Sequence, residues 1–188
     1  MAVKRATAIA TIDCALITIQ PSKSSDEIVL DTSNQLGVEP NIETTEAVKL
    51  IIKGILRAQK PEESTLTGHT LTLTDNVFSP ELVKILQGGT ITTDNESGKI
   101  TGYTPPVAGS DEKGEVFVLN AYSAIYDAAG LITGYEKISY PNCQGRPVAF
   151  GAEDGVFRTN SYTIISAPSQ GQAPYEITYP EELPVVTA

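Results

Sequence analysis

Apolar and polar residues alternate along much of this chain, and that period indicates β-strands rather than helices. In residues 6–19, ATAIATIDCALITI, the alternation places five residues on one face, namely Ala8, Ala10, Ile12, Cys14 and Leu16. Thr7, Thr11 and Asp13 interrupt the apolar positions, so we expect a strand here and not a cleaved signal peptide.

Residues 44–60, TTEAVKLIIKGILRAQK, fit two patterns. Lys49, Lys53 and Arg57 recur every four residues, as on a helix. Alternation instead places four apolar residues on one strand face, namely Val48, Leu50, Ile52 and Leu56. The β-branched residues and Gly54 favour the extended form, so we predict a strand.

One short helix is predicted at about residues 80–87, after a strand at 70–74 and a turn at Asp75-Asn76. Ser79 can cap the free N–H groups of the first turn, and Pro80 suits the first helical position. Glu81 complements the positive end of the helix dipole, and Gly88 can adopt the left-handed conformation that ends a helix.

The apolar stripe of this helix consists of Leu82, Ile85 and Leu86. A helix of two turns is not stable alone in water, so the stripe must pack against a sheet. That sheet belongs either to the same chain or to a neighbouring subunit, and the three residues are therefore candidates for a subunit contact.

Three hairpins are predicted after residue 89. Their turns fall at residues 94–98, at residues 127–130 and at Glu153-Asp154-Gly155. Residues 20–41 and 103–114 are predicted to be long loops, and residues 179–188 an extended C-terminal tail. We therefore expect a single mainly β domain over residues 1–188, an antiparallel β-sandwich or partial barrel with one short α-helix and long loops.

The formal net charge of −10 is unevenly distributed along the chain. Residues 1–60 are neutral, whereas residues 61–188 hold six basic and sixteen acidic residues and supply the whole excess. Binding to nucleic acid needs concentrated Lys and Arg, so this balance argues against it. No apolar run is long enough to span a bilayer, and we expect no membrane partner.

The sequence offers little for catalysis or cofactor binding. It contains no glycine-rich phosphate loop and no nucleophile elbow, and its single histidine, His69, has no sequence neighbour that suggests a triad. Cys14 and Cys143 form no metal-binding spacing and are either two free thiols or one disulfide. The acidic clusters match no calcium loop. We expect no catalytic residue, no cofactor, no metal site and no enzyme activity.

Three segments resemble the major tail tube proteins of tailed bacteriophages and prophage tails. They are TGHTLTLTDNVFSPELVKILQGGTI, the hairpin GEVFVLNAYSAIYDAAGLITGYEKISYPNCQG, and RPVAFGAEDGVFRTNSYTIISAPSQGQAPYEI. The resemblance covers roughly residues 44–178 and follows one order, a strand, a short helix and two hairpins.

The resemblance implies a structural virion protein whose hexameric rings stack into the hollow tail tube through which DNA passes without specific binding. Implied partners are further copies of the chain and the tail initiator, tape-measure and terminator proteins. The implied location is the virion tail, assembled in the bacterial host cytoplasm. The alternative is a monomeric β-sandwich that acts as an adhesive or carbohydrate-binding module.

A tube that conducts DNA should not bind it, so we expect a net negative lumen. The acidic candidates for the lumen surface are Glu115, Glu136, Glu153 and Asp154.

Overall fold

One antiparallel sheet organises most of the chain. The structure, a computed structural model, describes residues 9–24 and 27–186. Along the sheet the strands follow the order β2 (Ile28–Leu30), β1 (Thr11–Pro21), β9 (Phe117–Tyr126), β10 (Ile132–Gly145), β11 (Asn160–Ser166), β6 (Glu63–Asp75) and β3 (Ser33–Thr45), and β12 (Glu176–Thr178) pairs with β10 beside this path. Two further two-stranded sheets pair β4 (Val48–Ile52) with β5 (Ile55–Lys60) and β7 (Thr90–Thr93) with β8 (Ile100–Thr104).

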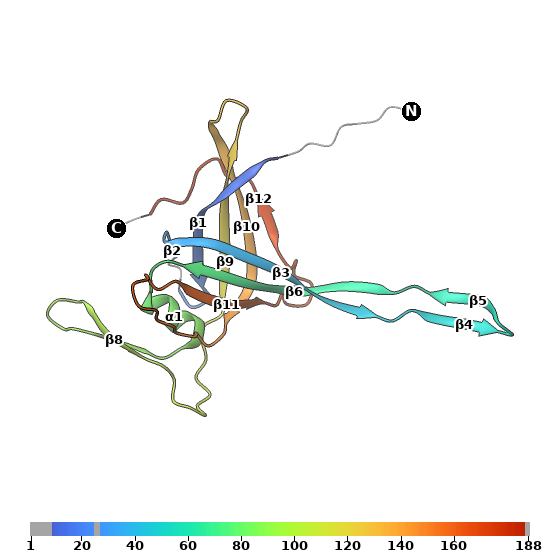
Figure 1. Cartoon of the computed structure of the whole chain (residues 1–188), viewed down its shortest axis with the longest axis horizontal. Helices are drawn as coiled ribbons and strands as arrows, with labels where there is room; N and C mark the ends of the chain where they lie inside the picture. Colours follow the sequence, from blue (N-terminus) through green and yellow to red (C-terminus); the bar gives the residue numbers. More distant parts are fainter. Residues whose placement is uncertain (1–8, 25–26, 187–188) are drawn as a thin grey trace.

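The sheet turns a corner within β10. The first part of this strand pairs with β9 and β12, and its last three residues pair with β11. Between Tyr140 and Cys143 the register shifts, and Asn142 has a φ of 48°, so the strand bends there. As a result β1, β9 and β10 run across the direction of β11, β6 and β3 (Figure 1). The sheet does not close into a barrel, and the predicted mainly β class is confirmed.

The core lies between the two halves of the bent sheet and under the helix. Its buried apolar side chains come from β1, β2, β6, β9, β10, β11 and α1, and include Ile17, Ile19, Leu30, Leu71, Leu73, Phe117, Leu119, Tyr140, Cys143, Tyr162 and Ile164. Strands from distant parts of the sequence therefore depend on one another for burial.

The predicted helix is present as α1 (Pro80–Gln87). Ser79 Oγ accepts a hydrogen bond from the backbone N–H of Leu82 at 3.3 Å, as expected of a capping residue. The backbone N–H of Gly88 donates to Lys84 O at 2.8 Å. Gly88 has the predicted positive φ, 84°, but its ψ of −161° lies outside the left-handed helical region, so that detail of the prediction was wrong.

Two of the predicted hairpins are confirmed. The turn between β7 and β8 is held by Asp94, whose Oδ1 accepts from the backbone N–H groups of Glu96 and Ser97 at 3.0 and 2.8 Å. These bonds lower the pKa of the Asp94 carboxyl group. In the turn between β9 and β10, Asp127 Oδ1 accepts from Ala129 and Leu131, and Gly130 has a φ of 80°.

The predicted hairpin around Glu153-Asp154-Gly155 was wrong. Residues 146–159 have no strand, and only the second predicted arm exists, as β11. The loop is fixed by other contacts, since the backbone N–H of Val148 donates to Gln87 Oε1 of α1 at 2.9 Å. Local turn residues do not show which strand is the partner, and here β11 pairs with β6 and the end of β10.

The long loop predicted over residues 20–41 was also wrong, because most of it is strand. Residues 28–30 form β2, and residues 33–45 form β3, which pairs along its whole length with β6. β3 is the last strand in the order of the sheet and is largely exposed, so its residues are polar and show no apolar alternation. Pro40 is tolerated because an edge strand can lack a backbone donor.

Residues 44–60 form a hairpin instead of the single predicted strand. The chain reverses between Ile52 and Ile55 through Lys53 and Gly54, which both have positive φ, 51° and 79°. Two consecutive residues of this kind are typical of the tightest hairpin turns. The prediction that this segment is extended was therefore correct, but the prediction of one continuous strand was wrong.

The single face predicted for the first strand is only partly confirmed. Leu16 is buried and Cys14 packs against the core. Ala8 lies outside the described residues, and Ala10 and Ile12 are exposed. A bulge between Ile12 and Leu16, with Asp13 at a φ of 63°, changes the phase of the alternation. As a result Ile17 and Ile19 belong to the core cluster.

The contact between β10 and α1 can be tested at Gly145, where a Cβ atom would lie 2.5 Å from backbone and side-chain atoms of Leu86. We predict that Gly145→Ala lowers the free energy of unfolding by about 1–3 kcal/mol, because the overlapping atoms cannot move freely. Gly151→Ala is the control, since a Cβ there meets nothing within 4 Å. Urea denaturation of both variants measures the difference, and equal stability would contradict the packing of α1 on β10.

Candidate assembly surface

A long two-stranded arm projects from the body (Figure 1). We define the arm as residues 41–68, which comprise the ends of β3 and β6 together with β4 and β5, and the arm tip as residues 48–60. Each of residues 48–67 is exposed to solvent. Because β3 and β6 continue from the sheet into the arm, the body fixes its direction.

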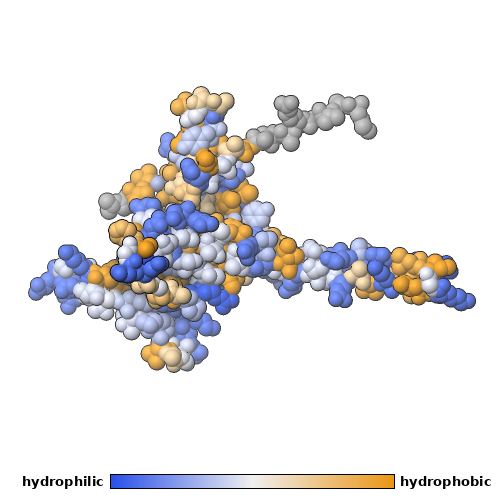
Figure 2. All heavy atoms as spheres, in the orientation of Figure 1, coloured by the Kyte–Doolittle hydropathy of each residue, from blue (hydrophilic) through white to orange (hydrophobic). Residues whose placement is uncertain are grey.

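The arm tip is rich in exposed apolar side chains, which Figure 2 shows as the orange end of the projection. Six large aliphatic side chains are 46–66% exposed, namely Val48, Leu50, Ile51, Ile52, Ile55 and Leu56. Val48, Leu50 and Ile52 alternate along β4 and share one face of the ribbon, whereas Ile51 lies on the other. Both faces are therefore apolar and uncovered.

The charge of the arm tip is opposite to that of the whole chain. Its thirteen residues contain four cationic side chains and no acidic one, namely Lys49, Lys53, Arg57 and Lys60. The chain as a whole carries a formal charge of −10. An apolar surface with this charge suits a partner that is both apolar and acidic.

An aromatic cluster holds the root of the arm. His69 on β6 is 6% exposed, and its ring lies 5.3 Å from Tyr140 and 5.5 Å from Tyr175, measured between ring centroids. His69 Nδ1 is buried and has no hydrogen-bond partner among the described residues. Burial lowers the pKa of His69 below its ordinary value of 6.5, because the charged form loses hydration.

The three helix residues proposed for packing or subunit contact lie inside their own chain. Leu82, Ile85 and Leu86 are buried in the core cluster together with Val83. The structure thus corresponds to the intramolecular alternative, in which α1 covers its own sheet. These side chains expose almost no surface that a second subunit could contact.

The four acidic candidates for a lumen surface do not form one cluster. Glu115 lies just before β9, and its carboxylate is 4.0 Å from Lys23 Nζ. Glu136 pairs with Ser123 of β9. At the rise of an extended chain, Ser123 lies about 26 Å from Glu115. Glu153 and Asp154 are exposed in the loop of residues 146–159. The structure of one chain does not bring them together.

The loop of residues 146–159 is a second exposed apolar region. Phe157 is 96% exposed, and Val156 and Phe150 are also exposed. Arg158 lies over the rings of Phe78 and Phe150, 4.9 and 5.5 Å from their centroids, and ties the loop to the residues before α1.

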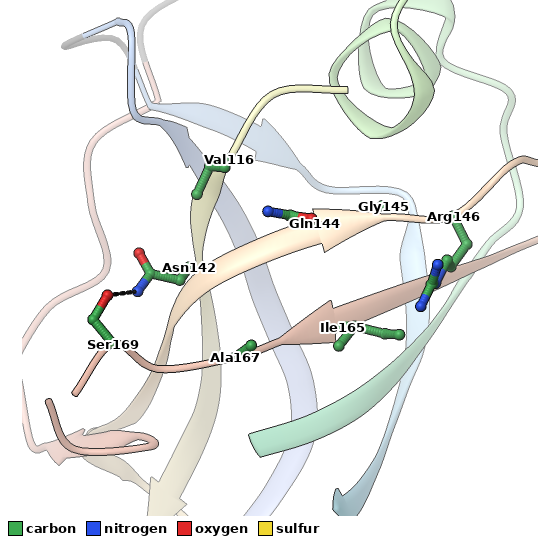
Figure 3. A pocket seen from close by; sticks show the side chains of 8 residues that line it. All are labelled: Val116, Asn142, Gln144, Gly145, Arg146, Ile165, Ala167 and Ser169. Atoms are coloured by element: carbon green, nitrogen blue, oxygen red, sulfur yellow. Dashed lines mark hydrogen bonds between the residues drawn. The ribbon is translucent and has the colours of Figure 1, made fainter. Parts of the chain in front are cut away.

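The surface of the described residues has several hollows. Figure 3 shows one beside the ends of β10 and β11, where Asn142 Nδ2 donates to Ser169 Oγ at 2.9 Å and Arg146 is the charged lining residue. Within the described residues, no group of three or more His, Cys, Asp or Glu side chains could hold a metal ion. No helix in that part of the chain is long and apolar enough to cross a membrane.

Both cysteines are free thiols, so the disulfide alternative was wrong. Cys143 is buried in the core, and burial raises its pKa to about 12. Burial also raises the pKa of Cys14. At neutral pH both are protonated and behave as small apolar residues.

The sequence predicted an extended conformation for residues 44–60 but not an exposed arm. A signal was present in residues 48–60, where aliphatic and cationic residues on both sides of Lys53-Gly54 match a hairpin with no buried face. The prediction of one continuous strand over residues 44–60 overlooked the turn at Lys53-Gly54.

The aromatic cluster at the root of the arm gives the protein an acid-sensitive site. Since folded His69 binds a proton less readily than unfolded His69, stability should fall as the pH drops below about 6.5. We predict that the free energy of unfolding falls more between pH 7 and pH 5 in the wild type than in His69→Gln. Urea denaturation at several pH values measures both slopes, and identical slopes would show that His69 does not contribute.

No protein-family model matches the chain, and no curated protein matches its sequence. One solved structure that aligns with it is described as the cryo-EM structure of the anti-feeding prophage (AFP) baseplate, 6-fold symmetrised. The alignment covers 94% of this chain and 97% of that chain, with 9% sequence identity and a TM-score of 0.37. A similarity of this size does not establish a common fold, and nothing about the function of this chain follows from it.

Proposed function

We propose that the protein is a structural subunit that polymerises through its arm into the hollow tail tube of a phage-type particle, as stacked hexameric rings. The observation that carries the self-assembly is the arm tip, with six large aliphatic side chains exposed on both faces of a two-stranded ribbon. The tube and the hexameric ring in this proposal rest on the sequence resemblance to major tail tube proteins.

The energetics favour a covered arm. Burying a half-exposed aliphatic side chain contributes on the order of 1 kcal/mol, so covering six contributes several kcal/mol. That is comparable with the whole stability of a small domain, about 5–15 kcal/mol. A two-stranded hairpin without a covering layer is marginally stable in water at best, so a partner that covers the arm would also stabilise its pairing.

The charge of the arm favours a polymer over a closed dimer. Two arm tips placed against each other would bring eight cationic groups together. Lys60 of each copy is paired with Glu63 at 3.5 Å, but Lys49, Lys53 and Arg57 would meet like charges, which is unfavourable. The arm tip should therefore meet a different surface of its partner. A contact between two different surfaces repeats from copy to copy and gives rings or filaments.

The same proposal assigns a structural and not a catalytic role, with tail initiator, tape-measure and terminator proteins as further partners in the virion tail. It also assigns a mainly acidic lumen, because ten excess carboxylates lie after residue 60 and conducting DNA requires weak binding. Glu115, Glu136, Glu153 and Asp154 remain the lumen candidates. A map of the assembled tube with a lumen lined mainly by Lys and Arg would contradict this assignment.

Removing the arm tests the proposal. In one variant Asn-Gly replaces residues 46–62, which joins the paired residues Thr45 and Glu63 by a two-residue turn. A second variant, Leu50→Ser with Ile52→Ser, keeps the arm and removes part of its apolar face. We predict that both fold, that the wild type forms rings or tubes at high concentration, and that neither variant does. Sedimentation velocity and negative-stain electron microscopy measure assembly, and circular dichroism measures folding.

The matched control is Leu131→Ser with Ile132→Ser, because these side chains at the turn between β9 and β10 are exposed to a similar degree. This control should assemble like the wild type. A wild type that stays monomeric over a wide concentration range, with tail initiator complex added, would contradict the proposal and favour the adhesive or carbohydrate-binding alternative. Assembly of the variant without an arm would show that the arm is not the assembly element.

A further inference from the structure

Strand β12 has one edge without a strand partner among the described residues and an apolar face that is about half exposed. It pairs with β10 through Lys137↔Thr178, Ile138↔Ile177 and Ser139↔Glu176, and no described strand pairs with its other edge. Tyr175, Ile177 and Tyr179 alternate along it and are all exposed. We call these three residues and the exposed Glu181 and Glu182 that follow them the β12 surface. Glu176 alternates with Ile177 and lies on the opposite face of the strand.

The charge of the β12 surface complements that of the arm tip. Residues 159–188 contain three acidic residues and no Lys or Arg, whereas the arm tip contains four cationic residues and no acidic one. Glu136 adds a carboxylate beside this surface, since it alternates with Ile138 and Tyr140 on β10. Each surface thus offers exposed apolar side chains with charges of one sign, and the signs are opposite.

The arm tip cannot reach the β12 surface of its own chain. Tyr175 contacts His69 at the root of the arm, with 5.5 Å between ring centroids. Ile55 at the far end lies fourteen residues along the strands from His69, which corresponds to about 45 Å at the rise of an extended chain. Figure 1 shows the same arrangement, with β12 beside the body and β4 and β5 at the far end.

We propose that the arm tip of one copy docks on the β12 surface of a second copy. The aliphatic side chains of the tip cover Tyr175, Ile177 and Tyr179, and its cationic groups lie near the carboxylates of Glu181, Glu182 and Glu136. The inference rests on the proposed function and specifies its contact. Since donor and acceptor lie at opposite ends of one hairpin, every copy offers both and the contact repeats from head to tail.

A membrane of anionic lipid is the alternative partner for a cationic, apolar hairpin such as the arm tip. The composition of the arm favours the protein partner, because residues 46–68 contain no Trp, Tyr or Phe to anchor the hairpin at a membrane interface. The complementary surface on the same chain is the second reason.

Charge reversal with rescue tests the contact. The arm-reversed variant carries Lys49→Glu and Arg57→Glu, and the β12-reversed variant carries Glu181→Lys and Glu182→Lys. In either variant alone like charges meet, and we expect the concentration needed for assembly to rise at least about tenfold. In an equimolar mixture each arm tip finds a complementary β12 surface on the other variant, so alternating assemblies should form near the wild-type concentration. Sedimentation and electron microscopy measure both results.

The control is Lys99→Glu with Lys113→Glu, which changes the net charge as the arm-reversed variant does but at exposed residues outside both surfaces. It should assemble like the wild type. If the wild type assembles and the reversed variants assemble equally well, or if the mixture is not rescued, the docking inference is wrong while the proposed function stands. A wild type that binds vesicles of anionic phospholipid and does not assemble would overturn both.

Discussion

A two-stranded ribbon cannot bury apolar side chains on both of its faces, and this constraint governs what the protein can do. In the body, the bent sheet and α1 supply the layers that cover one another, and Ile17, Leu71 and Phe117 are fully buried. In the arm the described residues supply no second layer, so Leu50, Ile51 and Ile55 remain about half exposed. Burial of these side chains therefore needs a layer from outside the described residues.

The body is built so that it can support such a projection. β3 and β6 pair over their whole shared length, from the end that carries Asp75 to the end that carries Glu63, and only one end of this ladder lies over the core. The aromatic cluster of His69, Tyr140 and Tyr175 lies where the ladder leaves the body. Because the bend in β10 places Tyr140 on that side, the corner of the sheet and the root of the arm are parts of one packed region.

Local signals predicted the elements whose structure is determined locally. Ser79, Pro80 and Gly88 gave the bounds of α1, and Asp127 and Gly130 gave the turn between β9 and β10, because short-range hydrogen bonds fix those conformations. The sequence failed where pairing is set at long range. β3 has the composition of a loop and is a strand only because β6 lies beside it, and the loop of residues 146–159 has a turn sequence but no partner for its first half. The arm was not predicted as a surface because the alternation of Val48, Leu50 and Ile52 is also that of a strand with one buried face.

Amide hydrogen exchange of the arm tip, in dispersed and in assembled protein, tests the central claim most directly, because it reports whether this hairpin is stable only when another copy covers it. In dispersed protein, residues 48–60 should exchange much faster than the paired residues of β9 and β10. In the assembled protein, the same amides should become protected, together with those of residues 175–179. Equal exchange of the arm tip in both states would contradict the account, because the arm would then be neither unstable alone nor covered on assembly.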